Sequence, residues 1–359
     1  MKKLDLYVLK KFLVTYFFVV LMLMLVITVI DITEKMEDFM KNNLSPGFIL
    51  VEYYFAFIPY MANLLSPITI FIATIFVTAN LAARTEIIAM LSSGMSLTRI
   101  MFPFLIGSMI IGAMVFYMAG WLIPHGNKTR IDFEKKYIKS AFFFSGKNVH
   151  IKTTPTTYVY LESYNSELNI GYQFTLETII DNKLESKMKA GRIHWNDSIK
   201  KWHIEEYFIR RFDTSGVEHV YTGKDKDTVL TITPKDFEDT YMLFETFDMS
   251  ELNRQIAILE SRGAENVDTY IVEKYQRYTY PFSVIILTLI GVIAASRKSR
   301  EGAGLTIAFG FLLAFVYIIF MITSRSLANV GGIGPLLASW IPNLVFMGIG
   351  TIMYRYVPK

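Results

Sequence analysis

The sequence predicts a polytopic α-helical membrane protein with six transmembrane helices, arranged three and three around an inserted all-β, jellyroll-like domain. Three observations predict this fold class. The chain of 359 residues is 52% hydrophobic and only 19% charged, with a mean hydropathy of +0.35. Six long stretches contain no charged residue, and they lie in two groups of three. Between the groups, residues 125–275 are polar and contain short runs in which polar and apolar residues alternate.

Each uncharged stretch is long enough to cross a bilayer, because a helix needs about 20 apolar residues to span roughly 30 Å of hydrocarbon. Backbone groups in lipid must hydrogen-bond within their own segment, so each stretch is expected to be helical. Pro67 and Pro342 are expected to kink the second and sixth helices. We assign residues 1–124 to the first three helices and residues 277–359 to the last three. The six stretches are Phe12–Ile30, Tyr53–Ala83, Ile100–Pro124, Tyr278–Ser296, Gly302–Ser324 and Ser326–Tyr354.

The first stretch has the basic start of a signal peptide, but its apolar run is too long. The charged run Asp31–Glu34 follows it in place of a cleavage site, so the segment is expected to be retained. Positive residues then favour one orientation, with both termini in the cytoplasm and the insert in the periplasm. In that orientation the short outer loops hold only Lys35, Lys41 and Arg325. The inner parts hold Lys2, Lys3, Lys10, Lys11, Arg84, Arg99, Arg297, Lys298, Arg300, Arg355 and Lys359.

The insert is expected to form an antiparallel sandwich or jellyroll over residues 125–247, because short strands separated by turn residues are typical of those folds. The Tyr, Trp and Ile residues of these runs either form an ordinary core or line an open interior that accepts an acyl chain. Tyr160 and Phe174 are the candidates for such acyl-chain contacts. The predicted strands include Thr157–Leu161, Tyr172–Leu176, Gly191–Trp195, Trp202–Tyr207 and Thr228–Ile232.

Residues 248–276 are expected to form helices that connect the insert to the membrane. Asp248 and Glu251 have the spacing of a capping box, which predicts a helix start at this point. That helix is expected to end near Gly263, and a second helix from about Val267 should lead into the fourth transmembrane helix.

Several functions find no support in the sequence. No G-x-x-x-x-G-K-[ST] loop occurs, so ATP hydrolysis by that route is excluded, and no nucleophile motif is found. The chain has no cysteine, and its net charge of +4 does not indicate nucleic-acid binding. The five histidines are scattered, although His194 and His203 lie on adjacent predicted strands and leave a metal site open. The central parts of the uncharged stretches lack the ionisable groups that ion-coupled carriers need.

The connector Asn80–Ser96, between the second and third stretches, has Ile87, Ile88, Met90 and Leu91 at helical spacing. This pattern predicts a short amphipathic helix that ends at Gly94. Two interpretations remain open at this point. The helix either lies on the lipid headgroups or docks into a groove of a cytoplasmic partner, with Glu86 paired to a basic residue there.

Four segments, in register along the whole chain, resemble sequences of the lipopolysaccharide export permeases, the paired inner-membrane subunits LptF and LptG. The first resembles their coupling helix, and the other three resemble the outer end of their third helix and the starts of their fourth and sixth. The segments are Arg84–Ser96 (RTEIIAMLSSGMS), Leu122–Asn127 (LIPHGN), Glu273–Ser283 (EKYQRYTYPFS) and Ala338–Asn343 (ASWIPN). The compact insert and the chain length favour the LptG-like member.

This resemblance implies a non-catalytic permease subunit in the inner membrane of a Gram-negative bacterium. Its partners would be a paralogous permease subunit, a dimeric cytoplasmic ABC ATPase that binds ATP and Mg²⁺, lipopolysaccharide, and a single-span periplasmic jellyroll protein. This chain itself would bind no cofactor. The resemblance implies that the lipid enters sideways between the first helix of one subunit and the fifth of the other. It then passes through the jellyrolls to a periplasmic bridge.

The resemblance also implies roles for particular residues. The coupling helix, at about residues 84–94, would contact the ATPase through Arg84, Glu86, Met90, Leu91 and Gly94. Basic residues near the outer end of the first helix would contact the lipid phosphates, which makes Lys35 and Lys41 candidates. By position, Arg325 is a further candidate.

Two other functions were weighed against the permease. In one, the helices only anchor a periplasmic lipid-binding or scaffold protein that has no transport cycle of its own. An anchor needs one helix rather than six, which disfavours this reading. In the other, the chain is a membrane enzyme that acts on lipid, but no catalytic constellation supports it.

Overall fold

The structure is a computed structural model, and it separates into two compact units. The helical unit comprises Met1–Ile138, Glu245–Leu252 and Asp268–Lys359, and the β unit comprises Lys139–Phe244 and Asn253–Val267. The structure describes residues 3–138, 149–154, 156–165, 168–181, 183–213, 217–230, 232–234, 243–262, 267–296, 303–329 and 331–356. Each unit is described separately.

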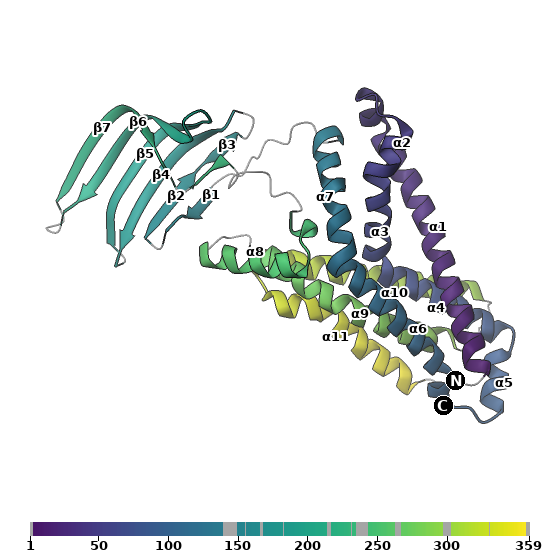
Figure 1. Cartoon of the computed structure of the whole chain (residues 1–359). Helices are drawn as coiled ribbons and strands as arrows, with labels where there is room; N and C mark the ends of the chain where they lie inside the picture. Colours follow the sequence, from purple (N-terminus) through teal and green to yellow (C-terminus); the bar gives the residue numbers. More distant parts are fainter. Residues whose placement is uncertain are drawn as a thin grey trace. The chain divides into compact units, whose positions relative to one another are not determined.

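The helical unit begins with α1 (Lys3–Lys41), a helix of 39 residues (Figure 1). At 1.5 Å per residue it is about 58 Å long, roughly twice the thickness of the hydrocarbon layer. Its most apolar part is only 11% buried within the unit, and α1 packs mainly against α4 (Ser66–Ala83) and α6 (Leu97–Tyr117). The first helix therefore presents a long apolar surface outward.

The second uncharged stretch does not form one straight helix. Its first residues, Tyr53 and Tyr54, are the end of η1 (Leu50–Tyr54), which follows α2 (Pro46–Ile49). The stretch then continues as α3 (Phe55–Leu64) and breaks at Leu65 before α4. The backbone of Leu65 leaves the helical region, with φ −92° and ψ 5°, and Pro67 in the first turn of α4 has no N–H to donate to the preceding turn. As a result, seven helices in the described residues, rather than six, are long and apolar enough to span a membrane.

The third stretch is longer than predicted. After α5 (Glu86–Ser92), the chain continues through α6, η2 (Met118–Leu122), α7 (Ile123–Phe133) and η3 (Glu134–Ile138) as one helical segment of 42 residues. The outer part of this segment packs against α3. A separate core forms there from aromatic residues of α1, η1, α3 and α7 together with Ile49 of α2, and it comprises Phe39, Ile49, Tyr53, Tyr54, Phe57 and Phe133.

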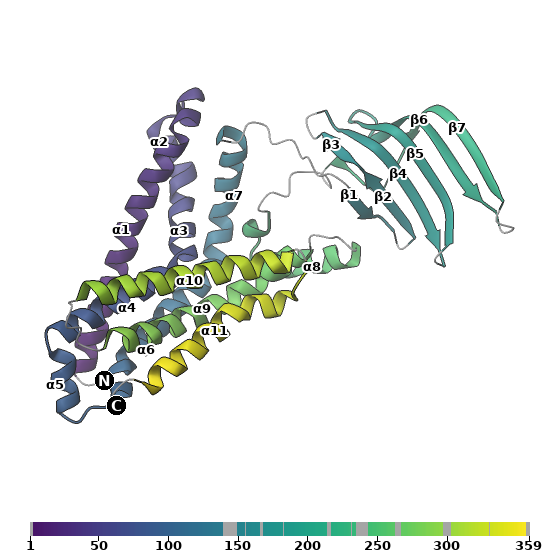
Figure 2. The ribbon, with the colours of Figure 1, turned by 180° about the vertical axis from the view of Figure 1, so that it is seen from behind.

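The second half of the helical unit contains η5 (Leu243–Thr246), the beginning of α8 (Met249–Arg262), α9 (Val267–Ala295), α10 (Ala303–Asn329) and α11 (Pro335–Arg355). The predicted capping box at the start of α8 is confirmed. Asp248 Oδ1 accepts from the Glu251 N–H at 2.8 Å, and Glu251 Oε2 accepts from the Asp248 N–H at 3.1 Å. The predicted stop at Gly263 lies outside the described residues. Figure 2 shows α10 crossing α4, and α10 also packs against α11.

The β unit confirms the predicted antiparallel β domain. Its strands are β1 (Val149–Lys152), β2 (Thr157–Leu161), β3 (Ser163–Asn165), β4 (Ile170–Ile180), β5 (Lys183–Asn196), β6 (Lys201–Phe212) and β7 (Glu218–Thr228). They form one sheet in the order β1-β2-β4-β5-β6-β7, with β3 paired to β4. The described strands therefore form a single, nearly sequential sheet rather than the two facing sheets of a jellyroll.

One predicted strand is wrong. The run Thr228–Ile232 begins at the last residue of β7, and the described residues after Thr228 are not in a strand. Two of its apolar residues pack on the sheet without joining it: Leu230 and Ile232 contact the core, and the Ile232 carbonyl accepts a hydrogen bond from Trp202 Nε1 at 2.8 Å. In this run, the alternating pattern therefore comes from a segment that covers the core and not from a strand.

Candidate functional site

The connector helix predicted from the sequence is present as α5. Ile87 and Met90 are buried in the same core cluster as Val8 and Phe12 of α1, so the inner face of α5 is fixed to the helical unit. The opposite face is exposed, as is Arg84, which caps α4 just before α5. Gly94 follows α5 with φ +84°, a conformation that favours glycine. Leu91 is partly buried. Of the five predicted contact residues, Met90 therefore anchors the helix, whereas Arg84 and Gly94 are accessible.

Glu86 contacts this chain's own first helix. Tyr7 donates to Glu86 Oε2 at 3.1 Å, and Lys11 Nζ lies 3.9 Å from Glu86 Oε1. A second polar contact lies close by, where Arg99 at the start of α6 donates to Asp5 Oδ2 at 2.6 Å. Asp5 is buried, so the first turn of α1 is held by a short ion pair. Neither contact could be predicted from the sequence, because the partners are far apart in the chain.

The two lysines predicted to contact lipid phosphates have different surroundings. Lys35 forms an ion pair with Asp31 at 2.6 Å, hydrogen-bonds to the Tyr53 hydroxyl, and lies over the Tyr53 ring. Tyr54 also donates to Asp31 at 3.0 Å. Lys41, in the last turn of α1, is exposed, and no ion pair joins it to a described residue. An ammonium that is already paired is a poorer point charge for a phosphate, so the geometry favours Lys41 over Lys35.

Arg325 lies near the end of α10 and faces α9. Its Nη1 donates to Gln276 Oε1 at 3.1 Å, and its Nη2 lies 3.5 Å from Glu273 Oε2. Glu273 also accepts from Arg277 Nε at 3.0 Å, so the two arginines share one carboxylate. Arg325, which the sequence predicts as a contact for lipid headgroups, is therefore part of a charged cluster.

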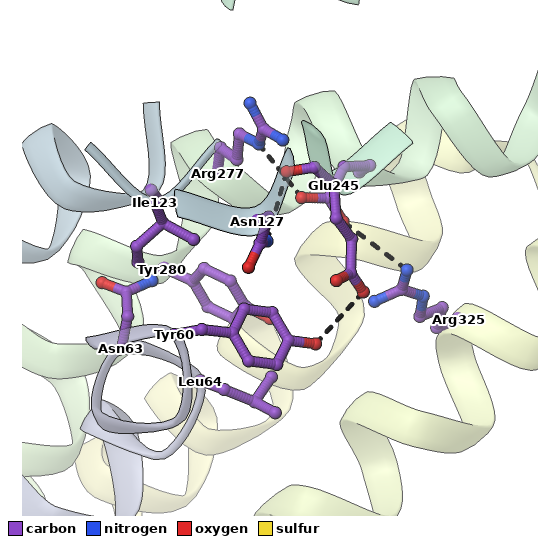
Figure 3. A pocket seen from close by; sticks show the side chains of 11 residues that line it. Tyr60, Asn63, Leu64, Ile123, Asn127, Glu245, Arg277, Tyr280 and Arg325 are labelled. Atoms are coloured by element: carbon purple, nitrogen blue, oxygen red, sulfur yellow. Dashed lines mark hydrogen bonds and ion pairs between the residues drawn. The ribbon is translucent and has the colours of Figure 1, made fainter. Parts of the chain in front are cut away.

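This cluster surrounds a small cavity of about 40 Å³, shown in Figure 3. The cavity is lined by α3, η2, α7, η5, α9 and α10, and it is large enough for two or three water molecules at about 10–15 Å³ each. Asn63 is buried, lines this cavity, and its Oδ1 has no hydrogen-bond partner among the protein atoms described. The lining residues are Tyr60, Asn63, Leu64, Ala119, Ile123, Asn127, Glu245, Glu273, Arg277, Tyr280 and Arg325.

Glu245 of η5 connects the cavity to α7 and α3. It accepts from Arg130 Nη2 at 2.8 Å and from the Tyr60 hydroxyl at 3.1 Å, and Arg130 also pairs with Glu134 at 3.1 Å. Burial, together with the negative charge of Glu273, raises the pKa of Glu245 to about 7, although Arg130 acts in the opposite direction. The sequence does not predict this cluster, because its members lie on separate elements that are far apart in the chain.

A second cavity, of about 260 Å³, shares Leu64, Tyr280 and Arg325 with the first. Its other lining residues are almost entirely apolar and come from the start of α4 and from α10. Leu65, at which the second helix breaks, also lines this cavity. Arg325 therefore lies between a polar cavity and an apolar one.

In the β unit, Tyr160 of β2 and Phe174 of β4 lie on paired strands. Phe174 is fully buried in the sheet's core, whereas Tyr160 is partly exposed, and both border a hollow of about 280 Å³. His194 and His203 are cross-strand neighbours, with their rings 4.8 Å apart. Within the part of the chain that the structure describes, no group of three or more His, Asp or Glu side chains could hold a metal ion.

Taken together, the helices that are long and apolar enough to span a membrane and the separate antiparallel β domain define a polytopic membrane protein with an inserted β domain. The sequence model of one family, described as lipopolysaccharide export system permease LptF/LptG, matches residues 6–356. This chain belongs to that family. The match covers both members together, so the assignment to the LptG-like member stays a prediction. A search of curated proteins found no match.

Proposed function

We propose that this chain is the transmembrane subunit of an ABC-type exporter, which extracts lipopolysaccharide from the outer leaflet of the inner membrane and passes it to a periplasmic bridge. The observation that carries the proposal is the family match over residues 6–356, combined with the geometry of α5. The inner face of α5 is fixed in the core, and its outer face is free to contact another protein. A partner that docks on the outer face of α5 would therefore displace the core to which α5 is fixed.

The energy source would be a separate dimeric ATPase, which binds the ATP and Mg²⁺ that this chain has no motif to bind. The ATPase would dock on the cytoplasmic end of the helical unit, where the start of α1, the end of α11 and α5 lie together (Figures 1 and 2). The basic residues of this end support a cytoplasmic location by the positive-inside rule. On this topology, α3 and the outer part of the segment Leu97–Ile138 extend past the hydrocarbon layer, so the broken second helix crosses the membrane once.

The lipid path would run beside the two helices that present the most apolar surface. In α1, 11% of the most apolar part is buried, and in the span Ile307–Asn329 of α10 the share is 22%, against 72% in α4. Outward apolar surface of this extent is suited to lipid or to a second subunit. A paralogous permease subunit would complete the chamber, with the exposed Lys41 as the first candidate contact for lipid phosphates and Arg325, already paired with Glu273, as a weaker one. In the β unit, the hollow at Tyr160 and Phe174 is the candidate acyl-chain contact, and a single-span periplasmic protein would extend the path.

The proposal is tested with the chain purified in complex with its second subunit and its ATPase, in vesicles that contain lipopolysaccharide. Glu86→Lys is expected to abolish ATP-driven release of the lipid. Glu37→Ala, at an exposed acidic residue of α1 far from α5, is the matched control and should leave release unchanged. Lipid release without any ATPase present would overturn the proposal.

Photocrosslinking locates the lipid path independently. A photoreactive residue at position 41 is expected to crosslink lipopolysaccharide more strongly than one at position 35, because Lys35 is enclosed by Asp31 and Tyr53. Positions 160 and 174 test the hollow in the β unit in the same way. If the β unit alone, expressed without the helices, restored export to cells that lack this protein, the anchored scaffold function would be favoured instead.

A further inference from the structure

Glu86 has partners within its own chain, although the proposed function uses it as a contact for the ATPase. Tyr7 and Lys11 lie one helical turn apart on α1, and Lys11 Nζ also donates to the Tyr7 hydroxyl at 3.3 Å. The two side chains therefore form one polar group facing Glu86. On the opposite side of α1, Asp5 accepts from Arg99, so the first two turns are held between α5 and the start of α6.

Apolar packing supports the same link. Val8 and Phe12 of α1 belong to one buried cluster with Ile87 and Met90 of α5. These residues fix the distance between the two helices, whereas Tyr7 and Lys11 set the rotation of the Glu86 side chain. Such packing is dense and has low compressibility, so it transmits a displacement.

The Glu86 carboxylate keeps capacity for another donor. Two oxygens provide about four acceptor positions, and the two contacts within the chain do not fill them. The side chain is also 27% exposed, so a cation from outside can reach it. One carboxylate can therefore bind α1 and an external basic residue at the same time.

We propose that Tyr7 and Lys11 are positioning residues that fasten Glu86 to the first two turns of α1, so that a displacement of α5 moves the first helix with it. This inference rests on the proposed function, because the displacement comes from an ATPase that docks on α5. Beyond that function, it identifies the part of the membrane domain that receives the movement. Because α1 is a single helix to Lys41, the movement would reach the outer cluster at Asp31 and Lys35.

The test uses the complete complex with its second subunit and ATPase. The double variant Tyr7→Phe/Lys11→Ala is expected to bind the ATPase and to hydrolyse ATP, while the lipid released per ATP falls about tenfold, equivalent to about 1.4 kcal/mol. Replacing Lys11 by Arg instead of Ala keeps the positive charge and should restore the amount of lipid released per ATP. Lys10→Ala is the matched control, because Lys10 is the exposed neighbouring lysine and no ion pair joins it to a described residue.

A distance measurement separates the link from transport. The chain has no cysteine, so Leu6→Cys and Ser92→Cys, both at exposed positions on α1 and α5, introduce the thiols needed for two spin labels. The distance between the labels is expected to stay constant between the nucleotide-free and ATP-bound complex. In the Tyr7→Phe/Lys11→Ala background it should shift and broaden.

Three outcomes overturn the inference: unchanged release per ATP in the double variant, no recovery with Lys11→Arg, or an unchanged label distance in the double variant. If the wild-type complex released no lipid at all, the proposed transport function would fail. The label distance would still support or overturn the link between α5 and α1.

Discussion

The two ends of α1 are held by different kinds of polar contact. At the first two turns, the side chains of Lys11 and Glu86 are 26% and 27% exposed, and their charged atoms lie 3.9 Å apart. At the far end, Lys35 and Asp31 are 17% and 11% exposed, and their atoms lie 2.6 Å apart. Two tyrosines and an aromatic core enclose the second pair. The Lys11–Glu86 pair is accessible to water and to other proteins, whereas the Lys35–Asp31 pair is enclosed.

This difference matters because burial changes the energetics of an ion pair. An exposed pair contributes about 0–1 kcal/mol and is screened by salt. A buried pair adds little net stability, but removing one partner leaves an uncompensated charge at a cost of about 3–5 kcal/mol. The clusters around Asp31 and Arg130 are therefore expected to be fixed structural elements. The polar contacts around Glu86 are expected to be individually weaker, and the apolar packing of α5 on α1 holds the two helices together with them.

The largest effect is expected at Arg130, whose side chain is 4% exposed and contacts both Glu134 and Glu245. Arg130→Ala leaves these two carboxylates without their cation. We expect it to destabilise the helical unit by about 3–5 kcal/mol, measured as a lower thermal unfolding midpoint in detergent.

The matched control is Lys128→Ala, two residues away on the same helix. The Lys128 side chain is 47% exposed and lies 3.5 Å from Glu251, so its loss should cost less than about 1 kcal/mol. Equal effects of the two variants would contradict the idea that burial separates the two kinds of contact.

A smaller effect is expected at Asp31, which accepts from Lys35 and Tyr54. Asp31→Ala leaves an ammonium beside aromatic rings, where cation–π contact compensates part of the loss. We expect a cost of about 2–3 kcal/mol, measured in the same way. Glu37→Ala, six residues further along α1 and exposed, should be nearly neutral. A neutral Asp31→Ala would show that the outer end of α1 does not depend on its polar contacts.

The membrane helices and most strands could be predicted from the sequence, because lipid and a sheet's core each select residues by a local pattern. The break at Leu65 could not be located in that way. Pro67 indicated a kink, but whether a helix bends or ends there depends on what packs against it. The run Thr228–Ile232 had the alternation of a strand because its residues cover the core, and alternation alone does not distinguish the two cases.

The polar clusters could not be predicted for a different reason. Glu245, Arg130 and Tyr60 are far apart in the chain and meet only after the helices pack. Similarly, the resemblance makes Lys35 a candidate contact for lipid phosphates, and only the fold shows that Asp31 and Tyr53 enclose it. A single sequence reports which residues are charged, but it does not report which of them are paired.

Glu245 makes the buried cluster sensitive to pH. Its pKa is raised to about 7 by burial, and in the unfolded chain a Glu titrates near 4.3. Between these values the folded protein holds a proton that the unfolded chain has released. The stability contributed by this group is therefore present below the unfolded pKa and is lost as pH rises through about 7.

Glu245→Gln imitates the protonated carboxyl and cannot titrate. We expect the difference in stability between this variant and the wild type to change by roughly 1 kcal/mol per pH unit across that window, with the variant gaining relative stability as pH rises. The measurement is the thermal unfolding midpoint of both proteins from pH 5 to pH 8, where the difference cancels other titrating groups. Parallel curves for the two proteins would mean that the folded protein does not raise the pKa of Glu245.

The smallest effect is expected at the N-terminal end of α1. In a double-mutant cycle, Lys11→Ala and Glu86→Ala should show a coupling energy of about 0.2–1 kcal/mol, which falls further at high salt because the pair is partly exposed. The same cycle on Asp31 and Lys35 should give a larger coupling that depends less on salt, since water and ions do not reach that pair as freely. Equal couplings with equal salt dependence would mean that the two ends of α1 are held alike.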